Sequence, residues 1–87
     1  MAYARKVDRN HAAILEALRA AGWHCHDTSA LPLFVDAIVA RRGRVELVEI
    51  KAPKGKVSEK QAAVHQAFLA AGVTVKVLRD IQDAVRL

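Results

Sequence analysis

The stretch LFVDAIVARRGRVELVEIK, residues 33–51, decides the fold of this 87-residue chain. Two β-rich runs flank ArgArgGlyArg at 41–44, which predicts a hairpin with a glycine at its tip. A two-residue or four-residue loop would centre the hairpin between Arg42 and Gly43, so that the numbers of opposed residues add to 85, as 42 and 43 do. A three-residue loop would instead shift the register and turn one strand's side chains to the other face.

In the first register, the acidic side chains of the hairpin lie on one face of the sheet. Asp36 is then opposite Glu49, and Lys51 follows Glu49 on the same face, opposite Phe34. Both faces are otherwise largely apolar: Ile38 is opposite Leu47 and Ala40 is opposite Val45 on this face, and the reverse face carries Val35, Ala37, Val39, Val48 and Ile50. We therefore expect the sheet to be covered on both sides.

Two carboxylates that face each other on neighbouring strands repel unless a cation lies between them. Oxygen ligands of this kind suit Mg²⁺ or Mn²⁺, and Lys51 beside them can act on a water molecule or on phosphate charge. The alternative is a simple ion pair between Lys51 and Asp36 or Glu49, since Glu-x-Lys alone has almost no specificity. The facing Asp36, the apolar surroundings and the basic loop after Lys51 favour the metal site.

The flanking segments complete a single α/β domain over residues 1–87. Before the hairpin we expect a helix over 11–21, with Asp8 or Asn10 as cap and Gly22 as stop, and a short strand over 23–28. After the hairpin we expect a helix from Ser58 to the stop at Gly72, a strand over 73–79 and a helix from Asp80. The apolar face of the helix from Ser58 consists of Val64, Ala67, Phe68 and Ala71. The order αβββαβα requires a crossover, so we expect a mixed sheet with at least one parallel pair.

Composition favours a polyanionic partner, because 14 Lys and Arg against nine Asp and Glu give a net charge of +5. Nucleic acid is the first candidate, and no apolar run is long enough for a membrane span. The N-terminus lacks an apolar signal stretch, and a single cysteine suits a reducing compartment, so the expected location is the cytosol. The spacing of His24, Cys25 and His26 matches no structural zinc pattern, and their role stays open.

Asp36, Glu49-Ile50-Lys51 and a helix opening with SerGluLysGln (58–61) together resemble the PD-(D/E)XK nuclease superfamily. Within it, the chain is most similar to the small stand-alone VRR-NUC domains of phages and bacteria. The resemblance implies a restriction-endonuclease-like αβββαβ core, a mixed sheet flanked by helices, that hydrolyses DNA phosphodiester bonds with Mg²⁺ or Mn²⁺. It also implies that Asp36, Glu49 and the Ile50 carbonyl bind the metal, that Lys51 is the catalytic lysine, that Gln61 lies in the active site, and that Glu16 adds an inward-facing acidic residue.

The expected substrate follows from the same resemblance. Stand-alone members look suited to act as homodimers on branched DNA, such as Holliday junctions or flaps, inside a bacterial or phage-infected cell. Two other functions are open: a non-catalytic nucleic-acid-binding module with this fold, and an RNA-directed or toxin-like nuclease. One departure is the residue before Asp36, which is usually proline in the family and is Val35 here, so the shape of the loop near the substrate is in doubt.

Several candidate residues also have structural interpretations. Gln61 with Ser58 forms a capping-box pattern, Glu16 could face solvent, and His65 fits a half-exposed helix residue as well as a DNA contact. The basic clusters could be solvated loops, but beside an acidic metal site they predict phosphate contacts. The expected DNA-binding residues are Arg41, Arg42, Arg44, Lys54, Lys56, Lys60 and His65.

Overall fold

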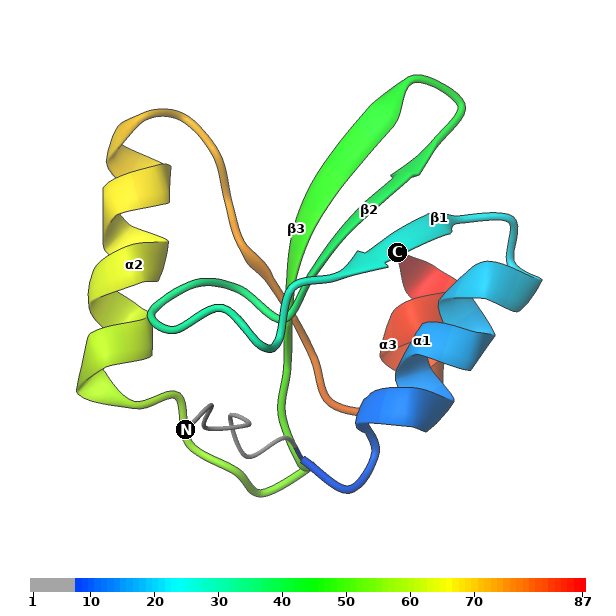
Figure 1. The fold of residues 1–87 in the computed structure, drawn as a ribbon, viewed down its shortest axis with the longest axis horizontal. Helices are drawn as coiled ribbons and strands as arrows, with labels where there is room; N and C mark the ends of the chain where they lie inside the picture. The colour runs from blue at the N-terminus through cyan, green and yellow to red at the C-terminus, as the bar shows by residue number, and fades with distance from the viewer. Residues whose placement is uncertain (1–7) are drawn as a thin grey trace.

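The computed structural model describes residues 8–87, and in it a four-stranded sheet has helices on both sides (Figure 1). The elements are α1 (His11–Ala20), β1 (His24–Asp27), β2 (Ala37–Arg41), β3 (Arg44–Ile50), α2 (Glu59–Ala70), β4 (Lys76–Leu78) and α3 (Ile81–Arg86). The strand order is β1-β2-β3-β4, antiparallel except for the parallel pair β3 and β4. The predicted mixed α/β sheet is confirmed, and so is the order of its elements.

The hairpin has the register expected from its tip. Ala37 pairs with Val48, and each later pair keeps the same sum of residue numbers as far as Arg41 with Arg44. The two-residue loop has positive φ at both positions, 49° at Arg42 and 79° at Gly43. Two-residue hairpin loops of this kind match the twist of the flanking strands, which explains why the register is fixed here.

β2 begins later than its apolar pattern predicts, at Ala37 instead of residue 33. The preceding segment is held by Thr28, whose hydroxyl donates to the Val35 carbonyl at 2.6 Å and whose amide donates to the Asp36 carbonyl at 2.8 Å. Side-chain bonds of this type compete with regular strand pairing. Residues 28–36 therefore form a loop that ends at Asp36 in a fixed position.

One face of the sheet carries the hydrophobic core, which α1 and α3 cover (Figure 1). Its buried members from the helices and strands include Ile14, Leu15, Leu18, Trp23, Ala37, Val39, Val48, Ile50, Leu78 and Ala84. The hairpin residues predicted for this face are all buried, as the alternation of strand side chains requires. Burial of this apolar area is the main stabilising term of the fold.

The opposite face of the sheet is only partly covered. α2 lies to one side of it (Figure 1), and none of the described side chains of this helix is buried. Val45 is 65% exposed, and its neighbour Leu47 is half-buried. A tilted ring contact between Phe34 and Phe68, with centroids 6.2 Å apart, is the apolar link to the helix. The expectation that both faces are covered is therefore wrong for this face.

The three predicted helix starts are confirmed, and two of them have a side-chain cap. The Ser58 side chain accepts the Gln61 amide and the Asp80 side chain accepts the Asp83 amide, each as an N-cap. Asn10 occupies the N-cap position of α1, but its side chain makes no capping bond with the described residues. It binds two distant carbonyl groups instead. Among the described helices, none combines the length and the apolar character needed to cross a membrane.

Candidate active site

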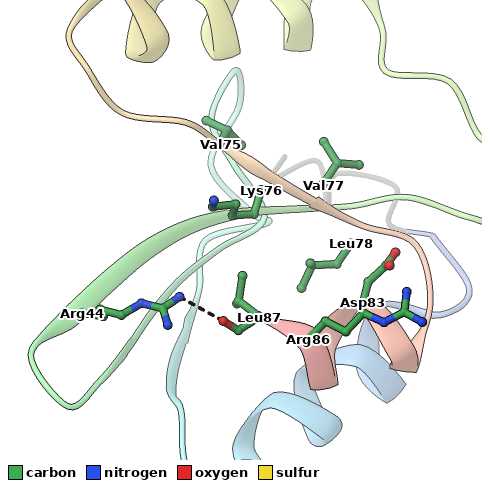
Figure 2. Close-up of a pocket in the computed structure, with 8 residues that line it drawn as sticks. All are labelled: Arg44, Val75, Lys76, Val77, Leu78, Asp83, Arg86 and Leu87. Atoms are coloured by element: carbon green, nitrogen blue, oxygen red, sulfur yellow. Dashed lines mark hydrogen bonds between the residues drawn. The ribbon is translucent and has the colours of Figure 1, made fainter.

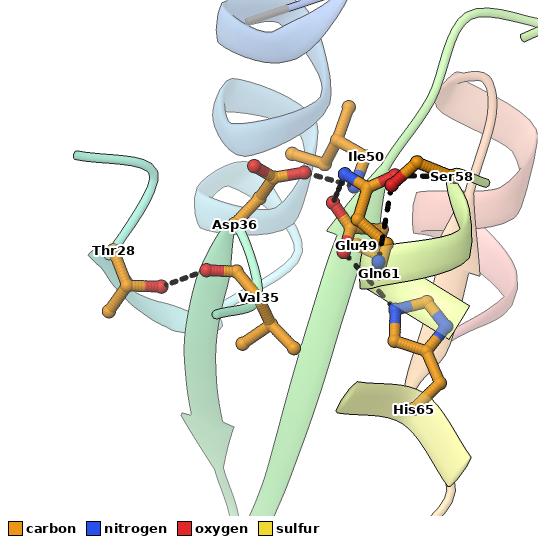
Figure 3. A network of polar contacts seen from close by, with 8 residues as sticks. All are labelled: Thr28, Val35, Asp36, Glu49, Ile50, Ser58, Gln61 and His65. Carbon is orange, nitrogen blue, oxygen red and sulfur yellow. Dashed lines mark hydrogen bonds and ion pairs between the residues drawn. The ribbon is translucent and has the colours of Figure 1, made fainter. Parts of the chain in front are cut away.

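Asp36 lies in the sheet at the last position before β2. Its side chain is buried, and Oδ2 accepts the Ile50 amide of the neighbouring strand at 2.7 Å (Figure 3). The carboxylate thus takes the place that a backbone carbonyl would have if the ladder continued. Because N–H and C=O of a strand residue point to the same side, the Ile50 carbonyl is directed toward the Asp36 side of β3 as well.

Glu49 is the most enclosed ionisable side chain of the site, with 1% of its surface exposed. Two side chains of α2 reach it across the open side of the sheet (Figure 3). Gln61 Nε2 donates to Oε2 at 3.3 Å, and His65 Nε2 lies 3.1 Å from Oε1. A buried carboxylate needs such donors, because an uncompensated buried charge is strongly destabilising.

Gln61 both caps α2 and contacts the candidate site, which are the two roles that its sequence pattern allows. Its Oε1 accepts the Ser58 amide at 3.0 Å, and its own amide donates to the Ser58 hydroxyl at 3.1 Å, which is a complete capping box. Its Nε2 is left to bind Glu49. The cap fixes the glutamine rotamer, so the start of α2 holds the amide group against the buried carboxylate.

The pKa of His65 responds to burial and to the charges of two other candidate residues, Lys51 and Asp36. Burial lowers the pKa of His65, the Lys51 ammonium lowers it further, and the Asp36 carboxylate opposes these effects only in part. A lowered pKa favours the neutral imidazole at pH 7, and its Nε2 faces Oε1 of Glu49. Asp36, Glu49 and Lys51 thus all lie near this histidine.

The donor set fits a hard divalent cation that keeps part of its water shell. Two carboxylates and one main-chain carbonyl are oxygen donors of the kind that Mg²⁺ and Mn²⁺ prefer. Within residues 8–87, no group of three or more His, Cys, Asp or Glu side chains is arranged to hold a metal ion. A cation at Asp36 and Glu49 would therefore need several waters or substrate oxygens, as Mg²⁺ usually does.

Glu16 does not belong to this site. It is exposed, whereas the buried residues of α1 are His11, Ile14, Leu15 and Leu18. These side chains pack on the core face of the sheet, and Glu49 faces the other way. The expectation that Glu16 faces inward as an extra metal ligand is wrong, because α1 covers the opposite side of the sheet.

The arginines of the hairpin tip bind the protein itself. The guanidinium carbons of Arg41 and Arg44 lie 4.5 Å and 5.1 Å from the centroid of the Trp23 ring. Arg41 also donates to the Ala21 carbonyl at 2.7 Å, and Arg44 donates to Glu46 at 2.9 Å. Glu49 is five residue steps along β3 from Arg44, which is roughly 17 Å at about 3.3 Å per residue. These arginines and the candidate site are therefore not brought together.

The lysines that follow β3 are better placed. Lys54, Lys56 and Lys60 are exposed, and all three belong to the loop and first helical turn between Lys51 and Gln61. Arg42 is exposed as well, but it lies at the hairpin tip with the other arginines. The structure thus leaves one of the two basic clusters next to the carboxylates.

A hollow of about 330 Å³ lies at the β4 edge of the sheet (Figure 2). Its charged lining residues are Arg44, Lys76, Asp83 and Arg86, and Arg44 donates to the Leu87 carbonyl there at 3.0 Å. Cations and an anion share this lining, and none of the predicted catalytic residues belongs to it. The hollow is separate from the carboxylate pair.

Sequence reasoning missed three residues that shape the site. Thr28 fixes the loop that ends at Asp36, Asn10 binds the Lys51 carbonyl at 3.0 Å, and Arg79 binds the carbonyls of the following turn. All three act through backbone carbonyls that are remote in sequence, which no local pattern reveals. For Thr28, the only signal was its place at the end of a short strand.

The fold is therefore a mixed α/β sheet with two buried carboxylates and a lysine at the base of its hairpin. Comparison of the chain with protein-family models finds no match, and a search of curated proteins finds no significant relative.

Proposed function

We propose that the protein is a divalent-metal-dependent nuclease of the PD-(D/E)XK type, similar to stand-alone VRR-NUC domains, with Asp36, Glu49, Lys51 and Gln61 in its active site. The observation that carries the proposal is the grouping of two buried carboxylates, one directly before β2 and one in β3, with a half-buried lysine after β3 and with Gln61 from α2. Burying like charges together costs stability unless a cation is bound there.

Each side chain has a defined task in this proposal. Asp36, Glu49 and the Ile50 carbonyl hold Mg²⁺ or Mn²⁺, which supplies charge stabilisation at the phosphate and a bound water of lowered pKa. Lys51 places an ammonium group beside the phosphate, where it balances negative charge that develops during hydrolysis. Gln61 and His65 orient the Glu49 carboxylate through their hydrogen bonds.

The partner is DNA, and the preferred form is branched, such as a Holliday junction or a flap. The net charge of +5 and the exposed lysines between β3 and α2 support contacts with phosphates, which carry no sequence information. Reading of DNA shape is therefore favoured over reading of sequence. The place of action is the cytoplasm of a bacterium or of a phage-infected cell.

The protein works as a homodimer in this proposal. One chain offers one carboxylate pair, whereas paired cuts on a branched substrate need two. The open sheet face, with Val45 exposed and Leu47 half-buried, is apolar and is the surface assigned to the second copy. Sedimentation analysis tests this assignment: Val45→Glu should convert a dimer into a monomer, and an unchanged mass for wild type and variant at the monomer value would reject it.

The test of the activity is cleavage of labelled four-way junction, flap, linear duplex, single-stranded DNA and RNA with Mg²⁺, Mn²⁺ or EDTA. We expect metal-dependent cutting that falls by about 100-fold or more in Lys51→Ala while DNA binding persists. Lys76→Ala is the matched control, because Lys76 is also half-buried but pairs with Val48 on the core face. Equal cutting by Lys51→Ala and wild type would refute the assigned site.

The alternative is a non-catalytic nucleic-acid-binding module with the same fold. One observation favours it: the Asp36 and Glu49 carboxylates accept hydrogen bonds from Ile50, Gln61 and His65, as members of a purely structural network would. Tight DNA binding without cutting under any metal would support this module. Cutting of RNA alone would identify the third candidate, an RNA-directed nuclease.

A further inference from the structure

The turn that follows β3 is held from outside by two side chains. Residues 52–55 form a tight turn in which the Gly55 amide donates to the Ala52 carbonyl at 2.9 Å. A Cβ atom at Gly55 would lie 3.3 Å from that carbonyl oxygen, so the glycine permits the close approach. The turn carries Lys54, and Lys56 follows directly; both are exposed.

Arg79 at the end of β4 binds this turn through its guanidinium group. Nη1 donates to the Ala52 carbonyl at 3.0 Å and to the Gly55 carbonyl at 2.5 Å. The backbone of Arg79 is itself fixed, because its amide donates to Asp83 Oδ2 at 2.8 Å. The charge of this half-buried side chain is directed at the two ends of the turn.

Asn10 completes the arrangement from the start of α1. Its Nδ2 donates to the Lys51 carbonyl at 3.0 Å and to the Arg79 carbonyl at 2.8 Å. The Lys51 amide donates in turn to the Leu78 carbonyl at 3.0 Å. The segment from Lys51 to Gly55 is thus tied to α1 and β4, on the core side of the molecule, and does not depend on α2.

We propose that Arg79 and Asn10 are positioning residues that preform the Lys51–Gly55 segment, so that Lys54 and Lys56 meet substrate phosphates without first having to be ordered. This inference rests on the proposed nuclease function for the identity of the ligand, and on the contacts above for the holding of the turn. Both donors of Arg79 Nη1 are occupied by carbonyl oxygens, so the part of the guanidinium that they define is engaged by the turn. A loop that is ordered in advance binds its partner at a smaller entropic cost.

The holding of the turn is tested without DNA by native-state trypsin cleavage, with the cut sites assigned by mass spectrometry. We expect cleavage after Lys54 and Lys56 to be at least severalfold faster in Arg79→Gln and in Asn10→Ala than in wild type. Arg86→Gln is the matched control, since this arginine of α3 is exposed and makes no hydrogen bond to residues 52–55. If Arg79→Gln unfolds, Arg79→Lys keeps the charge but loses the two-carbonyl fork, and the same acceleration is expected. Unchanged cleavage rates at both sites would overturn the proposal.

The link to the ligand is tested by DNA dissociation constants on four-way junction DNA in EDTA. Arg79→Gln should weaken binding by roughly tenfold, the effect of ordering about one residue on binding. In the background Lys54→Gln/Lys56→Gln, the same change should have no further effect. Losses that add in full would mean that Arg79 contacts phosphate itself and would overturn the positioning role. If wild type binds no DNA, the proposed function fails, and the trypsin result still decides whether the turn is held.

Discussion

Replacing Glu49 by glutamine should stabilise the metal-free protein. Glu49 and Asp36 are both buried, and Gln keeps the shape of Glu49. Its one oxygen can still accept from Gln61, and its amide group can donate to His65 in the neutral tautomer that leaves Nε2 unprotonated. Two like charges on neighbouring side chains repel by a few kcal/mol at an effective dielectric constant of about 20. The Lys51 ammonium offsets part of this repulsion, so we expect a net gain of about 1 kcal/mol in the free energy of unfolding, equivalent to a rise of about 4–8 °C in Tm for a domain of this size.

The same substitution should remove the response to metal. In wild type, Mn²⁺ at ten times its Kd should add about 1.4 kcal/mol to the free energy of unfolding, because it binds only the folded state. Thermal unfolding of both proteins in EDTA and with increasing Mn²⁺ measures both effects. Glu46→Gln is the control: it lies on the same strand, loses only an ion pair with the exposed Arg44, and should stay within about 0.5 kcal/mol of wild type with its metal response intact.

A Glu49→Gln variant that is less stable than wild type in EDTA would refute this reasoning. Glu49 would then be a favourable partner of Lys51 and His65 in a structural ion network, and the metal-site interpretation would lose its physical basis. The sign of the change in Tm therefore separates the two interpretations before any activity is measured.

Three further outcomes follow from other parts of the fold. Burial alone would raise the pKa of Asp27, but hydrogen bonds from Ser29 and from His11 outweigh burial and lower the pKa. Asp27→Asn should therefore reduce stability above about pH 4, by less than about 1 kcal/mol because the side chain is 42% exposed. In acid-unfolding curves, this difference should vanish as the pH falls through the lowered pKa. A deficit that persists at pH 2 would contradict this. Ser58→Ala should destabilise α2 by about 1 kcal/mol, which should appear as faster amide hydrogen exchange in this helix. The Tm should change little, since α2 buries none of its described side chains. A large fall in Tm would show that α2 is part of the cooperative core. Arg41→Gln should lower the free energy of unfolding, measured by urea unfolding, by about 1 kcal/mol because its stacking on Trp23 is lost. Arg42→Gln at the exposed turn should leave the free energy of unfolding unchanged. Equal effects of the two changes would reject the stacking contribution.

The hairpin could be predicted from sequence because its information is local. The alternation of apolar residues on both sides of Arg42-Gly43 fixes which side chains share a face, and the observed register agrees from Ala37 to Arg44. The elements around it follow from helix caps and glycine stops, such as Ser58 and Gly22, for the same reason. Local patterns define faces well, but they do not say which faces meet.

The errors in the prediction all concern contacts between remote segments. The family resemblance implied that Glu16 faces the site, but the side of the sheet that its helix covers is decided by the packing of Ile14 and Leu18. Asn10 was expected to cap α1, and it binds carbonyls more than 40 residues away. The coverage of the second sheet face is only partial for the same reason, since α2 buries none of its described side chains there.

The position of α2 depends on the candidate site itself. A helix without a buried side chain among its described residues has little hydrophobic stabilisation, so polar contacts carry more weight than usual in placing it. Two of those contacts, from Gln61 and His65, end on the Glu49 carboxylate, and the third link is the ring contact of Phe68. Any ligand that competes for Glu49 would therefore loosen α2, and any substrate that binds Lys54 or Lys60 at the helix start would hold it in place. Occupation of the carboxylates and the position of α2 are thus energetically linked, because both depend on the same oxygen atoms of one side chain.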